Sequence, residues 1–227
     1  NEDTYVIGER IFAVFDGATS LDGFTDPNGM TGGRIASSIA RQTFMEYDES
    51  LRSLAEEANQ KIRERMISAG VDLTDKTRLW CTTAAAIRMC EKSFDWLQIG
   101  DSLILVIYRD GSFQLLVEDY DDDREVLTIW KQLAGEREKN IRAVIGQGPL
   151  LALRRKANVT YGVMNGEREF GAFLKSGSVS LENVEHVILF TDGLFIPKED
   201  PTANDDWGMF VKLFLEGGLR SIVAYVR

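Results

Sequence analysis

The sequence predicts an α+β fold in which antiparallel sheets carry helices on their outer faces. Apolar residues recur at helical spacing in two stretches after residue 33, and again after residue 206. Between these stretches lie short strand-like runs separated by turn residues. Helices grouped on both sides of a block of strands favour segregated layers.

The first elements are a buried strand and two helices. Residues Ile11 to Phe15 are continuously apolar, which predicts a central strand that ends at Asp16-Gly17. A polar, Gly-rich loop over 20–33 follows. Helical spacing of apolar residues then predicts one helix over Ile35 to Tyr47 and a second over Leu51 to Met66.

The middle of the chain changes to the pattern of strands joined by short turns. The turns carry Glu91-Lys92-Ser93, Gly100-Asp101-Ser102 and Asp110-Gly111, and we expect them to connect one antiparallel meander. Asp110-Gly111 is the pair that best fits a hairpin turn. The predicted strands are Leu79 to Cys90, Phe94 to Ile99, Leu103 to Tyr108 and Phe113 to Val117.

After the meander, the sequence predicts one helix and two short strands. We expect a helix over about 123–134, with Val126, Leu127, Trp130, Leu133 and Ala134 facing inward. Further strands are predicted at 159–164 and 187–190, and His186 would lie in the loop before the second of them.

The last part of the chain is predicted to be helical. Trp207 to Leu215 forms an apolar stripe, Gly217-Gly218 interrupts it, and Leu219 to Val226 suggests a further helix. Asp205-Asp206 directly precedes the stripe, so we interpret it as a helix N-cap in preference to a metal ligand.

The composition limits the function classes. The chain has 227 residues, which fits one large domain, and its net charge of −10 argues against nucleic acid or an anionic membrane as partner. It contains no apolar run of membrane-spanning length.

A single histidine, His186, gives little support to a zinc site or a catalytic triad. Cys81 and Cys90 have neither metal-binding nor redox spacing, so we expect reduced core residues in a cytoplasmic protein. The sequence gives no indication of the oligomeric state.

Two segments share one design that points to chemistry. Each is a buried strand that runs into an Asp-Gly pair, Asp16-Gly17 in one case and Asp192-Gly193 in the other. A carboxylate at a strand tip suits Mg²⁺ or Mn²⁺, which take oxygen ligands and water, and the glycine would let a metal or phosphate approach the backbone. The alternative for a lone Asp-Gly pair is a plain turn.

Five motifs together resemble the metal-dependent protein phosphatases of type 2C, in their bacterial form. The two longest are Phe12 to Gly17 and Leu189 to Leu194, which look like the first and second metal motifs of that family. Asn1-Glu2-Asp3 resembles its acidic motif, Thr82 to Ala86 its Ser/Thr-rich strand, and Gln98 to Ser102 its Gly-Asp-Ser turn. Their order and approximate spacing agree with the family over nearly the whole chain.

The resemblance implies two stacked antiparallel β-sheets flanked by helix pairs, and a set of metal ligands. Asp16 would bridge two Mg²⁺ or Mn²⁺ ions, the carbonyl of Gly17 would ligate one of them, and Asp192 the other. Glu2 and Asp3 would act mostly through metal-bound water. Asp16 and Asp192 are therefore the candidate catalytic residues.

A third, weaker ion would be held by Asp101 together with Asp192. The sequence departs from the family in three places. No histidine follows Asp16-Gly17, the phosphate-binding arginine expected before the acidic motif is not seen, and no acidic pair opens a last strand. We therefore expect 1–227 to form a single type 2C phosphatase-like domain that lacks the first strand segment and the last strand, and that binds its second metal poorly.

The predicted function is metal-dependent hydrolysis of phosphoserine and phosphothreonine in a phosphorylated protein substrate. An aspartyl-phosphate hydrolase would need an acid two residues after the nucleophile, where Ala18 stands. The alternative from another class is a catalytically silent phosphatase-like module that binds or regulates. Asp16, Asp101 and Asp192 favour the enzyme, and the missing last aspartate favours the silent module.

Overall fold

The structure is a computed structural model that describes residues 2–18, 21, 23–46, 49–118, 124–136 and 140–227. Among the positions discussed above, Asn1, Ser20, Tyr47 and residue 123 lie outside the described residues. None of the described helices combines the length and apolar character that crossing a bilayer requires.

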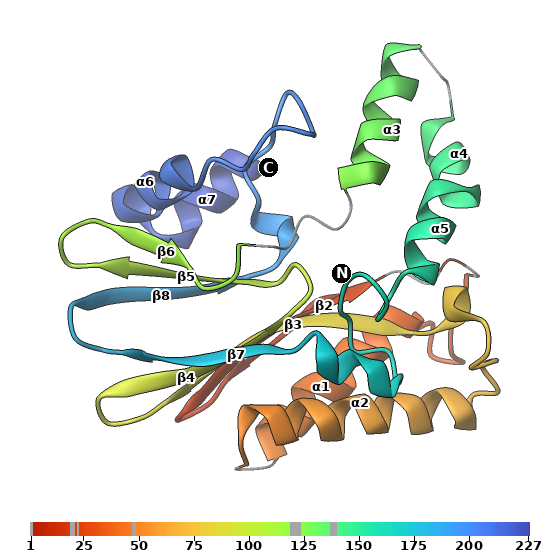
Figure 1. Cartoon of the computed structure of the whole chain (residues 1–227), viewed down its shortest axis with the longest axis horizontal. Helices are drawn as coiled ribbons and strands as arrows, with labels where there is room; N and C mark the ends of the chain where they lie inside the picture. The colour runs from red at the N-terminus through yellow and green to blue at the C-terminus, as the bar shows by residue number, and fades with distance from the viewer. Residues whose placement is uncertain (1, 19–20, 22, 47–48, 119–123, 137–139) are drawn as a thin grey trace.

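Two antiparallel sheets form the centre of the molecule, which confirms the predicted α+β class (Figure 1). The larger sheet has the strand order β1-β2-β3-β4-β7, and the smaller has the order β6-β5-β8. The strands of the larger sheet are β1 Thr4–Ile7, β2 Ile11–Ala18, β3 Cys81–Met89, β4 Ser93–Ile99 and β7 Lys175–Ser180. The strands of the smaller sheet are β5 Leu103–Tyr108, β6 Phe113–Leu115 and β8 Val184–Phe190.

The sheets stack face to face through an apolar layer. Ala85, Ile87 and Phe94 of the larger sheet pack with Ile104 and Val106 of the smaller one, and all five are buried. Because side chains alternate across a strand, residues two positions apart share this inner face. The inner face of β2 therefore carries Phe12, Val14 and, next in the alternation, Asp16.

Helix pairs cover both outer faces, as Figure 1 shows with α1 and α2 below the sheets and α6 and α7 above them. Helices α1 (Gly32–Glu46) and α2 (Leu51–Ser68) bury Ile35, Phe44, Leu54 and Ile62 against the larger sheet. Helices α6 (Trp207–Gly217) and α7 (Leu219–Val226) do the same for the smaller sheet.

A third group of helices stands apart from these layers (Figure 1). Its members are α3 Arg124–Gly135, α4 Ile141–Gln147 and α5 Pro149–Arg155. One exposed ion pair lies within the group, between Glu125 of α3 and Lys156 after α5 at 2.8 Å. Another joins the group to the loop before α6, between Lys131 of α3 and Asp200 at 2.5 Å. The expected inward face of α3 is wrong in part, because only Val126 of it is buried, whereas Trp130 and Ala134 are exposed.

The predicted meander is wrong at one junction. β4 pairs with β3 and β7, and β5 pairs with β6 and β8, so the chain leaves one sheet for the other between Ile99 and Leu103. Gly100 makes the turn with φ +73°, a left-handed conformation that glycine adopts without steric cost. Asp101 therefore lies where the chain passes between sheets, and not on a hairpin.

Two smaller predictions also fail, whereas a third is confirmed. Residues 159–164 form no strand, and the described segment contains only isolated bridges and turns. His186 lies inside β8, opposite Ile107, with its ring 5.1 Å from that of Phe214. Asp110-Gly111 is the predicted hairpin turn between β5 and β6. In the described residues, short 3₁₀ helices also occur at Lys76–Arg78, Arg168–Ala172 and Asp192–Leu194 (η1, η2 and η3).

Candidate metal centre

Asp16 is fixed inside a strand. β2 does not end at Asp16-Gly17 as predicted but continues to Ala18, because Asp16 stays in register with Thr83 and Gly17 with Thr82. The hydroxyl of Thr82 donates a further hydrogen bond of 2.7 Å to the carbonyl of Asp16. The carboxyl group is thus held on a rigid base and points from the inner face of the larger sheet.

Gly17 serves a packing role. A Cβ atom added to Gly17 would lie 2.4 Å from the carbonyl oxygen of Gly33 and 2.8 Å from that of Glu2. A Cβ atom on Gly33 would in turn lie 2.5 Å from the carbonyl oxygen of Ala18. The backbone of α1 therefore packs directly on the backbone of β2, and neither position has room for a side chain.

Asp3 lies beside Asp16, just before β1. The two carboxyl groups share a hydrogen bond, and the hydroxyl of Thr191 lies 3.4 Å from Oδ2 of Asp3. Arg34 of α1 donates a 2.6 Å hydrogen bond to the carbonyl of Asp3. Asp3 thus connects the first acidic segment with the residue that precedes Asp192.

Glu2 is oriented differently. Its carboxylate accepts a short hydrogen bond from the hydroxyl of Thr31, next to the start of α1. Its charge is not among the influences that raise the pKa of Asp16. The structure therefore places Glu2 at the helix start and brings Asp3, Asp101 and Asp192 toward Asp16.

Asp192 and Asp101 complete the cluster from two other elements. Asp192 is exposed and begins η3, two residues after β8 ends at Phe190. A Cβ atom on Gly193 would meet only the hydroxyl of Thr191, at 3.7 Å, so this Asp-Gly pair lies in open space. Asp101 is half-buried on the turn that joins the two sheets.

The cluster perturbs the acidity of Asp16 strongly. The pKa of the Asp16 carboxyl is raised to about 9, first by burial and then, in decreasing order, by the charge of Asp192, the hydrogen bond and charge of Asp3, and the charge of Asp101. Every one of these influences disfavours the ionised form. A divalent cation would reverse the situation by neutralising the carboxylates.

The donor set fits hard cations. It consists of carboxylate oxygens and backbone carbonyls, the ligand types that Mg²⁺ and Mn²⁺ prefer. Within the part of the chain that the structure describes, no group of three or more Asp, Glu, His or Cys side chains is arranged to hold a metal ion by itself. Ions held here would keep several water ligands, which is usual for Mg²⁺ in proteins.

Sequence reasoning missed one residue near the cluster. Arg154 belongs to the basic run Arg154-Arg155-Lys156, and its guanidinium contacts the buried Sγ of Cys81 at 2.5 Å. Burial raises the pKa of the Cys81 thiol, and the charges of Asp16 and Asp101 raise it further, against the opposing effect of Arg154. Nothing in the local pattern of Arg154-Arg155-Lys156 distinguishes the inward arginine. Cys81 and Cys90 are both free, but Cys90 is only half-buried.

The acidic pair before α6 has a structural role. Asp206 accepts a 2.8 Å hydrogen bond from the backbone N–H of Met209, which confirms the predicted N-cap. Asp205 pairs with Lys198 at 3.0 Å. Neither carboxylate is among the main causes of the raised pKa of Asp16.

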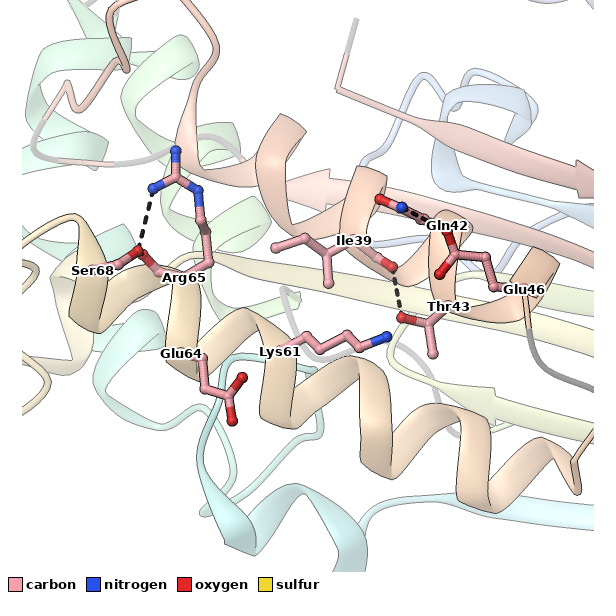
Figure 2. Close-up of a pocket in the computed structure, with 8 residues that line it drawn as sticks. All are labelled: Ile39, Gln42, Thr43, Glu46, Lys61, Glu64, Arg65 and Ser68. Atoms are coloured by element: carbon pink, nitrogen blue, oxygen red, sulfur yellow. Dashed lines mark hydrogen bonds between the residues drawn. The ribbon is translucent and has the colours of Figure 1, made fainter.

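A separate groove of about 400 Å³ lies between α1 and α2 (Figure 2). Its charged groups make local contacts: Gln42 donates to Glu46 at 2.7 Å, and Arg65 lies 3.4 Å from the hydroxyl of Ser68. The groove belongs to the outer helix layer, whereas Asp16 lies on the inner face of the sheet. It is therefore not part of the carboxylate cluster.

Comparisons with known proteins place this geometry in context. The profile of the protein phosphatase 2C family matches residues 4–217. No curated protein matches the chain.

Three solved structures share the fold. The catalytic domain of the serine/threonine phosphatase PstP, in complex with two manganese ions, is 16% identical with a TM-score of 0.57 over 100% of this chain and 83% of that chain. PstP/Ppp of Mycobacterium tuberculosis is 17% identical with a TM-score of 0.58, again over 100% and 83%. PppA, a regulatory component of T6SS in Pseudomonas aeruginosa, is 16% identical with a TM-score of 0.62 over 100% and 84%.

Proposed function

Because the chain belongs to the protein phosphatase 2C family, we propose that it hydrolyses phosphoserine and phosphothreonine in proteins with the help of Mg²⁺ or Mn²⁺. The observation that carries the proposal is the carboxylate cluster around Asp16, which combines burial, like charge and a hydrogen bond to Asp3. Such a group is costly in a folded protein unless a cation or a proton neutralises it.

We assign the ligands as follows. Asp16, with the carbonyl of Gly17, and Asp192 would hold two divalent ions, and Asp3 would contribute through water. Asp101 would hold a third, weaker ion together with Asp192. Glu2 stays in the proposal as a water-mediated contributor, although its carboxylate faces Thr31. A PstP structure with two manganese ions supports the number of ions, since that protein shares the fold.

The bound ions would supply Lewis acidity toward a water molecule and toward the phosphoryl oxygens, as in other two-metal sites. The residues of this chain do the rest. Asp16 would give up its proton on binding cations, because their charge would lower its pKa. The β2 strand keeps that carboxylate in place through the Thr82 hydrogen bond to its carbonyl. Preorganised charges of this kind supply most of the stabilisation in phosphoryl transfer.

A phosphorylated protein is the partner that this function requires. The net charge of −10 supports neither nucleic acid nor an anionic membrane as a partner. A cytoplasmic location is part of the proposal and is supported by the free Cys81 and Cys90. The silent regulatory module is not favoured, because Asp3, Asp16, Asp101 and Asp192 are all present and the other three act on Asp16.

The test is hydrolysis of an aryl phosphate and of a phosphothreonine peptide, with added Mn²⁺ and then with excess EDTA. We expect turnover of both substrates with Mn²⁺, loss of turnover in EDTA, and recovery when Mn²⁺ is returned. Full activity in EDTA would contradict the two-metal chemistry. Absence of all activity under every metal condition would instead favour the silent module.

A further inference from the structure

A cavity of about 140 Å³ lies next to the carboxylate cluster and has no role in the chemistry proposed above. It is bounded by the turn after β4, by residues 160–162, and by the start of β7. Gly100, which lines it, directly precedes Asp101. The cavity thus begins one residue away from a carboxylate that acts on Asp16.

Its floor is backbone. A Cβ atom on Gly100 would lie 2.5 Å from Cγ2 of Thr83 and 3.2 Å from the carbonyl oxygen of Gly162. A Cβ atom on Gly162 would lie 2.3 Å from Cβ of Phe173. Both glycines are thus packed tightly against neighbouring side chains, and a side chain at either position would displace part of the cavity lining.

Its wall is held in place by a polar network. Asn158 donates to Asn165 at 2.7 Å and accepts from the N–H of Val163 at 3.0 Å. Asn59 of α2 accepts from the N–H of Gly166 at 2.8 Å, and Asn158 and Asn165 are almost fully buried. The segment that carries Thr160 and Tyr161 is therefore fixed at both ends, and the cavity is preformed, as ligand sites usually are.

The chemistry of the lining favours an acidic guest. Lys175, Thr160 and Tyr161 can each donate a hydrogen bond, and no aspartate or glutamate is among the described lining residues. Lys175 is exposed, and no carboxylate in the described part of the chain pairs with it. Phe173 adds an apolar side that suits the methylenes of a short chain.

We propose that this cavity is a specificity subsite that receives an acidic side chain, best a glutamate, close to the phosphorylated residue of the substrate protein. The proposal rests on the proposed phosphatase function. An extended peptide advances roughly 3.3 Å per residue, so a residue a few positions from the phosphate can reach the cavity while the phosphate lies at the carboxylate cluster.

The experiment scans one phosphothreonine peptide with glutamate, glutamine or lysine at each position within four of the phosphate. The value of kcat/KM is measured for the wild type, for Lys175→Met and Lys175→Glu, and for the control Lys92→Met, which removes an exposed lysine from the β3–β4 turn. We expect the wild type to prefer glutamate over glutamine by about fivefold at one or two positions, the size expected for an exposed ion pair. Lys175→Met should abolish the preference, and Lys175→Glu should favour lysine.

Two further measurements separate the possible failures. Aryl phosphate turnover should be equal in the wild type and Lys175→Met, because that substrate has no side chain to place in the cavity. Wild-type inactivity toward aryl phosphate would defeat the proposed function, and peptide binding by fluorescence anisotropy would then test the glutamate preference without turnover. Equal values for glutamate and glutamine peptides, or equal losses in Lys175→Met and Lys92→Met, would overturn the subsite.

Discussion

The two Asp-Gly pairs of this chain are the same dipeptide in two different environments. Asp16-Gly17 lies inside a strand, its glycine pressed against Gly33 and its carboxyl surrounded by other carboxyls. Asp192-Gly193 opens a 3₁₀ turn, where Asp192 is exposed and Gly193 has free space around it. One pair is part of the core architecture, and the other is attached to its edge.

The difference shows that two Asp-Gly pairs can each present a carboxylate while their glycines have different roles, close packing for Gly17 and none for Gly193. We predicted that both glycines would allow a metal or phosphate to approach the backbone. For Gly17 the close neighbour is protein backbone, since the carbonyls of Gly33 and Glu2 fill the space. Substitutions at the four positions can separate the contribution of each pair to catalysis from its contribution to stability.

The largest effect should come from the carboxylates. Asp16→Asn should lower phosphatase kcat by about 10²–10³-fold, the loss typical of one preorganised electrostatic group, and Asp192→Asn should lower it less because that residue is exposed. Steady-state kinetics at saturating Mn²⁺, with circular dichroism to verify folding, provides the measurement. Asp206→Asn is the matched control, since asparagine also caps helices. A folded Asp16→Asn enzyme with near wild-type turnover would show that the site is elsewhere.

The glycines should differ in stability by the next largest amount. Gly17→Ala forces a methyl group into backbone atoms closer than 3 Å, so we expect a loss of about 3 kcal/mol or more in the free energy of unfolding. Gly193→Ala should change it by less than about 0.5 kcal/mol. Urea denaturation of both variants tests the contrast. Equal losses would mean that the packing of α1 on β2 does not distinguish the two pairs.

The stability of the metal-free protein should depend on pH through the titration of Asp16. Its pKa is raised to about 9 in the folded state, above its ordinary value of 3.8, so the folded protein holds a proton that the unfolded chain releases. Stability in EDTA should therefore fall as pH rises from about 4 to 9. Asp16→Asn should flatten this slope and stabilise the metal-free protein at neutral pH by about 1–3 kcal/mol. An unchanged slope in thermal melts of the variant would assign the titration to another group.

The smallest effect concerns the segment after the second pair. Asp206 caps α6 with a 2.8 Å hydrogen bond from Met209, and Asp206→Ala should cost about 1 kcal/mol of unfolding free energy. Catalysis should survive, because the carboxylate of Asp206 is engaged in the cap of α6. Chemical denaturation and kcat on the same preparation test both statements. A large loss of kcat with little loss of stability would restore Asp206 as a candidate ligand.

Much of the fold was predictable because the periodicity was strong. Helices α1, α2, α6 and α7 and strand β5 occur where the apolar spacing indicates them. The passage between sheets at Gly100 was not predictable, because the strands on either side of it have apolar inner faces that fit either sheet. Strand β7 was missed because Lys175–Ser180 is an exposed edge strand with few apolar residues.

The failure over 159–164 has a different cause. Val159 to Met164 has the local character of a strand, but the side chains of Asn158 and Asn165 satisfy the backbone and each other within one loop. A buried polar network formed with α2 thus overrides local preference, and only tertiary structure reveals it.

The candidate site was predictable only through the resemblance. Patterns alone gave two strand-associated carboxylates, and the comparison with a family added Asp3 and Asp101, which the structure places near Asp16. The contact of Arg154 with Cys81 and the acidic-guest cavity by Lys175 involve residues far apart in sequence, so no local signal exists for them.

The crossing at Gly100 also has a consequence for how the chain is made. β4 and β5 follow each other directly, but each finds its second neighbour, β7 and β8 respectively, only after the third group of helices has been synthesised. During translation each of these strands therefore has one unpaired edge until its second neighbour has been synthesised. Unpaired edges can form hydrogen bonds with other chains. Pairings this distant in sequence also slow folding. A nascent chain shorter than residue 190 should be a strong client for chaperones that cover exposed strands.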